Sequence, residues 1–291
     1  MFVSRFLTPS RWVRRPYKGR PSYRPVLEPL EDRLALAVIL WDGGPHGMGH
    51  DWNDPANWVG GHLPGPDDDA QIGAEFAGTT IVSAYDVNIN SLTSAASIAI
   101  SHGTFSLAAD SVLDNDLTLS GGTLAVAGTL SVGGAYTQTA GITRLDGGTL
   151  AVPLVDLQGG LLTGSGPILG DVQNAGLIDL GNAEHGLAGT LSIAGNYTQT
   201  ASGVLNVKIG GLGQGTEYDF ISVGGTATLD GRLAITLTNH FVPQDGDTFT
   251  PLSFGDRTGD FAEVHGLDIN PHLAFSLSYD DNNLNLNTYF T

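Results

Sequence analysis

Two nearly identical stretches decide the fold of this 291-residue chain: Gly128-Thr-Leu-Ser-Val-Gly-Gly-Ala-Tyr-Thr-Gln-Thr139 and Gly189-Thr-Leu-Ser-Ile-Ala-Gly-Asn-Tyr-Thr-Gln-Thr200. Nine of their twelve positions are identical, and the second stretch follows the first at an offset of 61 residues. This offset fits three turns of about 20 residues each, within the range of stacked solenoid repeats. We therefore expect Tyr136 and Tyr197 on one face of a solenoid, three turns apart.

The segments around these copies are short and alternate apolar residues with small or polar ones. Examples are Ser97-Ile-Ala-Ile100, Thr104-Phe-Ser-Leu107 and Asp116-Leu-Thr-Leu119. A period of two is typical of a strand with one buried face. The 41 glycines and the lack of a 3.6-residue apolar stripe exclude helical repeats. We expect an all-β protein with a right-handed parallel β-solenoid over residues 86–210.

Composition excludes several classes of site and partner. Cysteine is absent, so disulfides, thiolate metal sites and cysteine nucleophiles are excluded. The formal charge is −18, and residues 39–291 hold four basic against 27 acidic side chains. Because such a body repels nucleic acid and anionic membrane surfaces, we expect no nucleic-acid partner.

Residues 1–38 have the opposite charge, with eight basic and three acidic side chains. They lead into the apolar run Leu34-Ala-Leu-Ala-Val-Ile-Leu40, the order of an export signal, and Ala35-Leu-Ala37 fits a cleavage site. The run is far shorter than the ~20 residues of a membrane span, so no transmembrane segment is expected. Residues 1–38 are interpreted as an export signal with cleavage near Ala37, or else as a disordered basic segment.

One part of this segment resembles a known signal. Leu27-Glu-Pro-Leu-Glu-Asp-Arg-Leu-Ala-Leu36 is similar to the N-terminal motif of many exported planctomycete proteins, which typically reads Leu-Glu-x-Leu-Glu-x-Arg-x-Leu-Leu. The chain departs from that motif in having Ala35 before Leu36. The resemblance implies an extracellular or cell-surface location and says nothing about activity.

Residues 39–85 contain three tryptophans, Trp41, Trp52 and Trp58, among Gly, Pro, Asn and Asp residues that indicate turns and short strands. This segment resembles one that opens autotransporter-like surface β-solenoids. One interpretation makes it a cap whose aromatic rings plug the open solenoid end. The other makes the three tryptophans candidate glycan contacts. Because large aromatic side chains mostly serve burial, we favour the plug.

Residues 211–291 read as a C-terminal β-rich cap module. Residues 218–237 predict three strands, and residues 273–279 and 284–290 flank the turn at 280–283. At Tyr218-Asp219, 223–227 and 246–249 the module resembles the one that ends many bacterial surface solenoids. The repeats before it resemble autotransporter-associated β-repeat passengers.

Parallel β-helices also include polysaccharide lyases and hydrolases, whose chemistry needs paired carboxylates or a calcium site with a base. The candidate acidic and imidazole groups are Asp156, Asp171, Asp179, Glu184 and His185. The basic residues of the body are Arg144, Lys208, Arg232 and Arg257, and none lies in a recognisable catalytic motif. We expect no catalytic residue.

Two segments have oxygen or imidazole groups that suit metal ions. Asp67-Asp68-Asp69 offers hard ligands for calcium but lacks the spaced ligands of a known loop. His46, His50 and Asp51 match no known ligand set. We expect no bound metal and no cofactor.

These observations favour a secreted or cell-surface structural or adhesion-type β-solenoid without catalytic activity. The alternative is a carbohydrate-binding or polysaccharide-active β-helix protein that uses the Trp-rich end. Candidate partners are extracellular polysaccharides or other cell-surface proteins.

Overall fold

The computed structural model describes residues 37–181 and 188–291. The predicted export segment therefore lies outside the described residues except for Ala37 and Val38, and Glu184 and His185 lie outside them too. Residues 36–291 form one compact unit by their contacts. In its described part the regular elements are strands and three short 3-10 helices: η1 (Gly44–His46), η2 (Pro55–Asn57) and η3 (Ala74–Phe76).

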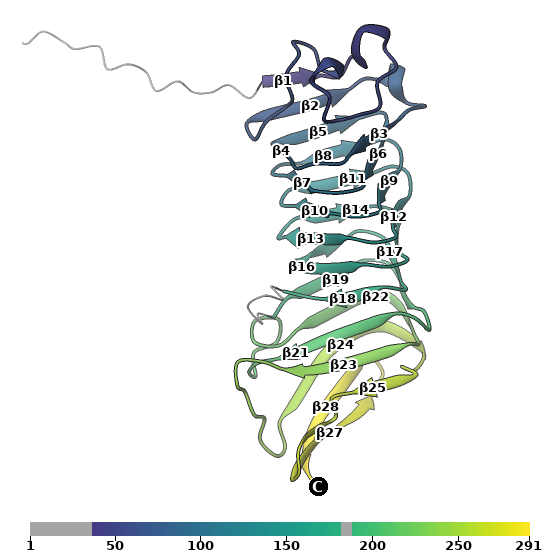
Figure 1. The fold of residues 1–291 in the computed structure, drawn as a ribbon. Helices are drawn as coiled ribbons and strands as arrows, with labels where there is room; N and C mark the ends of the chain where they lie inside the picture. The colour runs from purple at the N-terminus through teal and green to yellow at the C-terminus, as the bar shows by residue number, and fades with distance from the viewer. Residues whose placement is uncertain (1–36, 182–187) are drawn as a thin grey trace, which may run out of the picture. The chain divides into compact units, whose positions relative to one another are not determined.

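The strands form a parallel β-solenoid with three faces, so the expected fold class is confirmed (Figure 1). In each coil the chain passes through a first, a second and a third face. The first face consists of β1 (Ala37–Leu40), β2 (Asp68–Ile72), β5 (Ser91–Ser94), β8 (Ser111–Leu113), β11 (Thr129–Val132), β14 (Thr149–Ala151), the end of β16 (Leu161–Ile168), β19 (Thr190–Ile193), and the first halves of β22 (Phe220–Leu229) and β24 (Thr248–Gly259).

The second and third faces are built in the same way. The second face consists of β3 (Thr80–Ser83), β6 (Ser97–Ile100), β9 (Leu117–Leu119), β12 (Tyr136–Gln138), β15 (Leu154–Leu157), β17 (Asp171–Asn174), β20 (Tyr197–Gln199) and the second halves of β22 and β24. The third face consists of β4 (Val87–Ile89), β7 (Thr104–Leu107), β10 (Thr123–Val126), β13 (Ile142–Asp146), the start of β16, β18 (Leu177–Asp179), β21 (Val204–Ile209), β23 (Arg232–Leu237) and β25 (Glu263–His265).

The two tyrosines of the repeat lie in one column of the second face. Tyr136 pairs with Val155, Val155 with Val172, and Val172 with Tyr197, all in parallel register. Three coils therefore separate Tyr136 from Tyr197, as the offset of 61 residues predicts. The three steps are unequal, however, because they advance by 19, 17 and 25 residues.

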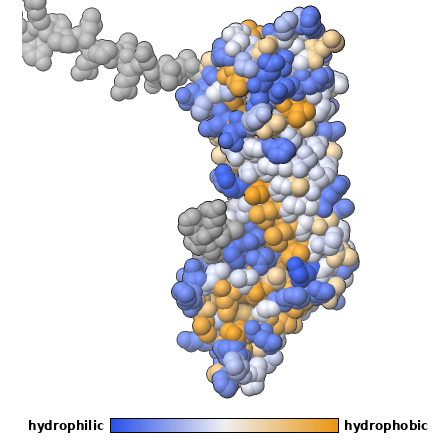
Figure 2. Space-filling model, in the orientation of Figure 1, coloured by the Kyte–Doolittle hydropathy of each residue, from blue (hydrophilic) through white to orange (hydrophobic). Residues whose placement is uncertain are grey.

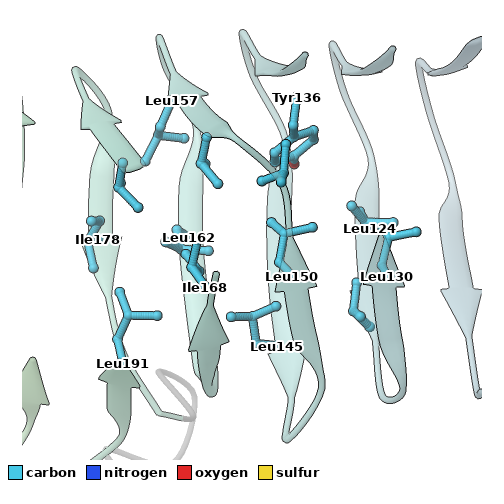
Figure 3. Close-up of a cluster of buried hydrophobic side chains, with 14 of the residues drawn as sticks. Leu124, Leu130, Tyr136, Leu145, Leu150, Leu157, Leu162, Ile168, Ile178 and Leu191 are labelled. Carbon is cyan, nitrogen blue, oxygen red and sulfur yellow. The ribbon is translucent and has the colours of Figure 1, made fainter. Parts of the chain in front are cut away.

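The core is a set of stacked inward columns, because alternate strand residues point to the same side. On the second face one such column runs through buried side chains from Ile81 to Ala227, and its members are Ile81, Ile98, Leu117, Tyr136, Val155, Val172, Tyr197 and Ala227. Figure 3 shows Tyr136 of β12, Leu145 of β13 and Leu150 of β14, one from each face, pointing into the interior. Each coil thus buries its apolar side chains against the coils on both sides.

Stacked glycines form the corner between the second and third faces. Gly103, Gly122, Gly141 and Gly160 all have a left-handed φ of between +71° and +81°. A Cβ at Gly122 would lie 2.3 Å from the carbonyl oxygen of Gly103 in the preceding coil. Only glycine combines this conformation with so close an approach, which explains its spacing in the sequence.

Aspartates bridge successive coils at the corners, where the strand ladder is interrupted. In each case a carboxylate oxygen accepts a hydrogen bond from a backbone N–H of the next coil, at 2.7 to 2.8 Å. The pairs are Asp86 with Thr104, Asp110 with Thr129, Asp116 with Ala135, and Asp171 with Asn196. Part of the acidic charge therefore has a structural role.

The N-terminal segment covers the first coil on two faces. Strand β1 pairs with β2, and the backbone of His50 and Trp52 bonds to Val82 of β3. The first coil itself, β2 to β4, ends at Ile89, and coils continue past residue 210 to β25. The divisions drawn at residues 85 and 210 therefore do not mark breaks in the stacking.

The C-terminal end is closed by antiparallel strands. Strand β28 (Asn283–Phe290) pairs with β27 (Leu273–Tyr279) and with the first half of β24, and β26 (Asp268–Asn270) pairs with β27. The hairpin expected at 273–290 is confirmed. The three strands expected within 218–237 are two, because β22 bends through a register shift between Val223 and Thr226 and serves two faces.

The later coils are longer because they carry inserts at one corner. Residues 180–189, 210–219 and 238–247 each join a third-face strand to the next first-face strand. Earlier coils cross this corner with much shorter connections, such as residues 127–128 between β10 and β11. The corner between the third and first faces is therefore where the C-terminal coils differ from the rest.

Candidate functional site

The three tryptophans of the N-terminal segment are buried. Trp41, Trp52 and Trp58 are 3%, 1% and 1% exposed. Trp58 packs edge-to-face on both of the others, and its indole N–H donates to the carbonyl oxygen of Trp52 at 2.8 Å. Trp52 also packs edge-to-face on Phe105 of β7, inside the solenoid. Their ring faces are not available to a sugar, so the burial agrees with the plug and not with the glycan platform.

The candidate metal ligands near this end are used in local hydrogen bonds. Asp51 accepts from the backbone N–H of Asn53, and the His50 ring bonds to the carbonyl oxygen of Thr80. Asp68 accepts from the N–H of Gly65, and Asp69 accepts from the side chains of Asn90 and Ser91. Within residues 37–181 and 188–291 no three His, Asp or Glu side chains are grouped as a metal would require.

The candidate catalytic carboxylates do not form a pair. Asp156 on β15 and Asp171 on β17 belong to the second face, whereas Asp179 ends β18 on the third face. Asp156 accepts a hydrogen bond from Gln158, and Asp171 bridges to Asn196. Asp179 alone faces a basic residue, Lys208.

Of the basic residues, Arg144 and Arg257 form exposed ion pairs. Arg144 binds both carboxylate oxygens of Asp146 at 2.9 Å. Arg257 pairs with Asp260 and lies over the Tyr279 ring, 3.9 Å from its centroid. No basic cleft for an acidic polymer results from this arrangement in the described part of the chain.

Arg232 lines a small pocket at the corner between the second and third faces. The pocket has a volume of about 220 Å³ and is formed by Ala201, Ser202, Gly203, Val204, Gly231, Arg232, Ala262 and Glu263. Its walls are mainly small residues and backbone, with one residue of each charge.

The chemically unusual group of the molecule is a cluster of Lys208, Asp219 and Asp179 at the insert corner. Lys208 is 4% exposed and Asp219 is 1% exposed. The Lys208 Nζ donates to Asp179 Oδ1 and to the carbonyl oxygen of Leu180, and lies 3.3 Å from Asp219 Oδ2. One ammonium group therefore lies between two carboxylates.

Backbone geometry fixes the two aspartates. Asp179 pairs in register with Asn206, two residues before Lys208 on β21, so the lysine reaches it diagonally across the strands. Asp219 closes the 210–219 insert: its N–H donates to the Lys208 carbonyl oxygen, and its carboxylate accepts from the N–H groups of Lys208 and Gly189 at 2.8 and 2.7 Å. The insert thus folds back onto β21 and covers the outer side of Lys208.

The environment changes the acidity of Asp219. Burial raises the pKa of this carboxyl to about 6, and the nearby Lys208 charge and the backbone hydrogen bonds act in the opposite direction. A carboxyl with such a pKa takes up and releases a proton near neutral pH, next to the only ammonium group of residues 37–291. This combination places a proton-exchanging carboxyl 3.3 Å from an amine.

No protein-family model matches the chain, and no curated protein is significantly similar to it. Inferences about function therefore rest on the sequence and the geometry alone.

Sequence reasoning named Asp179 and Lys208 separately and did not join them to Asp219. The three residues are 29 and 11 positions apart, and no local motif connects them. One signal was available: Lys208 is the only lysine after Lys18. A single lysine on a strand made mainly of Val, Leu and Ile points to a specific partner, because unpaired lysines are almost never fully buried.

The outer surface of the coils is mixed in polarity. Figure 2 shows apolar side chains among polar ones on one side of the molecule. The large exposed apolar residues on the coils include Val112, Leu154, Leu169 and Leu212. In the described residues, no helix has the length and apolar character needed to cross a membrane.

Proposed function

We propose that the chain is an exported, non-catalytic β-solenoid that serves as a structural or adhesion-type protein outside the cell or at its surface. The observation that carries this proposal is a continuous core whose two ends are both closed by aromatic side chains. The tryptophan plug closes one end. At the other, Phe249 packs edge-to-face on Tyr218, Phe241 and Phe275 under the β27–β28 hairpin.

Closed ends matter because open strand edges pair with other chains. A solenoid whose core is closed at both ends is a rigid element in which every coil is hydrogen-bonded to its neighbours. Such an element suits a spacer or a scaffold that holds its surface at a fixed geometry, and it needs no disulfide outside the cell.

The adhesive part of the proposal is supported by a polar outward column on the second face. It is formed by Thr118, Thr137, Asp156, Gln173, Thr198, Thr228 and Thr258, one from each successive coil. Regularly spaced hydroxyl, amide and carboxylate groups offer hydrogen bonds to a hydroxyl-rich polymer. Extracellular polysaccharide and other cell-surface proteins are the candidate partners.

Export is tested by labelling intact cells and by measuring the mass of the secreted or surface-exposed protein. We expect surface labelling and a chain that lacks the basic segment up to about Ala37. Leu36→Glu, which interrupts the apolar run, should retain the protein inside the cell, whereas Lys18→Ala should not. A full-length chain found in the cytosol alone would contradict the proposal.

Adhesion is tested by co-sedimentation of the purified protein with insoluble extracellular polysaccharide. The double variant Thr137→Lys/Thr198→Lys changes the second face, and Ser131→Lys/Ser192→Lys is a control of equal charge on the first face. We expect weaker binding only for the second-face variant. Equal binding by both variants, or release of sugar fragments by the wild type, would count against a non-catalytic adhesive surface.

A further inference from the structure

The Lys208 cluster brings together the parts of a condensation reaction. An amine lies against one carboxyl, which is the acceptor, and within 3.3 Å of a second carboxyl that is buried. The amine and the second carboxyl are withdrawn from solvent, while the Asp179 side chain keeps 18% of its exposure. Removal from water favours neutral groups over charged ones, and hence an amide over an ion pair.

We propose that Lys208 and Asp179 join in an intramolecular isopeptide bond between β21 and β18, with Asp219 transferring the protons. This inference goes beyond the proposed function and does not depend on export or adhesion.

The reaction is a balanced loss of water. Asp219 takes a proton from the Lys208 ammonium group, and the neutral Nζ attacks Cγ of Asp179. The bond between Nζ and Cγ forms, and one bond between Cγ and a carboxylate oxygen breaks. That oxygen leaves as water after receiving two protons by way of Asp219, both of which came from the ammonium group. The nitrogen keeps its third hydrogen, and no oxidant or co-reactant is required.

The position of Asp219 suits this role. Its carboxylate is held by the N–H groups of Lys208 and Gly189, so it stays directed at Nζ. A pKa near 6 lets it accept a proton and then return it at neutral pH. The exposed side of Asp179 gives the released water a path to solvent.

The bond would give this chain a covalent cross-link, which it cannot obtain from disulfides. Cysteine is absent, and Lys208 is the only lysine in residues 37–291. The tie closes residues 179–208 into a loop at the corner where the inserts begin. A cross-link there restricts the unfolded chain in the same way as a disulfide would.

A tryptic map of the purified, folded and then denatured protein decides the question. Trypsin cleaves after Arg144, Lys208 and Arg232, so a free lysine yields fragments 145–208 and 209–232. An acylated lysine resists cleavage. We expect a single fragment 145–232 that is lighter than its sequence by one water molecule, with fragment ions that place the link between Asp179 and Lys208.

A second measurement is independent of the digest. In denaturant, an amine-acylating reagent should leave Lys208 of the wild type unlabelled. Asp179→Ala should restore both cleavage and labelling at Lys208, and Asp219→Asn should lower the linked fraction at least about tenfold. The control Asp156→Asn changes an outward carboxylate of the second face and should keep the link.

Each contrary result has a definite meaning. A wild-type chain that gives fragments 145–208 and 209–232 at full mass overturns the proposal, whatever the variants do. A link that maps to Asp219 overturns the choice of acceptor. Should Asp219→Asn remain fully linked, the role given to Asp219 is wrong.

Discussion

The two copies of Tyr-Thr-Gln-Thr occupy the same column of the second face, yet they complete their buried hydrogen bonds with different partners. Both tyrosines are fully buried, and both glutamines, Gln138 and Gln199, are 1% exposed. The backbone position is the same in each copy, as parallel register requires. What differs between the copies is the third polar side chain, the one that bonds to the tyrosine hydroxyl in addition to the glutamine.

In the first copy that third side chain comes from the same coil. Thr143 on β13 bonds to the Tyr136 hydroxyl and donates to Gln138 Oε1 at 2.6 Å. The residues in register with Gln138 in the coils before and after it are Leu119 and Leu157, which offer no polar partner.

In the second copy the partner comes from the preceding coil. Asn174, in register with Gln199, donates to the Tyr197 hydroxyl at 3.1 Å, and Tyr197 donates to Gln199 Oε1 at 2.6 Å. The residue that the strand register places at the position of Thr143 in this coil is Leu205, which has no hydroxyl. On the second face the repeat thus fixes where each tyrosine lies, while the residues around it decide how its polar group is satisfied.

The largest loss of stability should come from removing the aromatic ring of either Tyr136 or Tyr197. Tyr136→Ala and Tyr197→Ala each leave a cavity in a closed core, and we expect each to lower the free energy of unfolding by ~3–5 kcal/mol. Chemical denaturation followed by circular dichroism measures this. Similar losses support equivalent positions, and a loss below ~1 kcal/mol in one copy would show that the copies are not equivalent.

Removing only the hydroxyl should separate the two copies. In Tyr197→Phe, Gln199 Oε1 loses the one donor that the described residues give it, which should cost about 1–3 kcal/mol. In Tyr136→Phe, Thr143 still donates to Gln138, so we expect about 0.5–1.5 kcal/mol. The reverse order, measured by the same denaturation, would disprove the networks as described.

Alkaline pH should lower the free energy of unfolding, with an equal contribution from Tyr136 and Tyr197. Burial raises the pKa of each phenol, because the ionised form is poorly solvated in the core. The folded state therefore keeps a proton that the unfolded state releases near pH 10, so stability is complete below that pH and falls above it. We expect a loss of about 1.4 kcal/mol per phenol for each pH unit above 10. The double variant Tyr136→Phe/Tyr197→Phe should show a flatter dependence in a denaturation series, and an unchanged slope would contradict this.

The smallest expected effect is the coupling energy of the hydrogen bond between Asn174 and Tyr197, which lie in successive coils. In a double-mutant cycle, Asn174→Leu and Tyr197→Phe should be coupled by about 0.5–1.5 kcal/mol, since their side chains are in contact. The matched cycle of Asn174→Leu with Tyr136→Phe should be additive within about 0.5 kcal/mol. Equal coupling in both cycles would mean that the coil-to-coil contact is not specific.

The sequence predicts the parts of this fold that depend on local pattern. Alternation in segments such as 116–119 identifies strands, and the offset between Tyr136 and Tyr197 identifies three coils. Even so, register on the first face departs from the repeat: Leu130 aligns through Leu150 and Ile168 with Ile193, two residues beyond its counterpart Leu191. A shift of two keeps the inward side chains inward, so the apolar pattern cannot reveal it.

The candidate site was less predictable for a physical reason. Asp179 and Lys208 lie on the paired strands β18 and β21, and Asp219 joins them only because the 210–219 insert folds onto β21. Neither the length nor the path of that insert follows from strand periodicity. Burial of Trp52 and Trp58, in contrast, was predictable, because large aromatic rings at an open end of a solenoid have apolar surface to cover.

The stacking of coils is tested most directly by distances along the second face. Because the chain has no cysteine, pairs introduced at outward positions carry spin labels at known sites. Thr118, Thr198, Thr228 and Thr258 lie in one outward column, with the last three at four, five and six coils from the first. Pulsed electron paramagnetic resonance should give backbone separations from Thr118 of about 19, 24 and 29 Å, rising by ~4.8 Å for each coil. Distances that fail to increase in this order would contradict a parallel solenoid with these strands in one column.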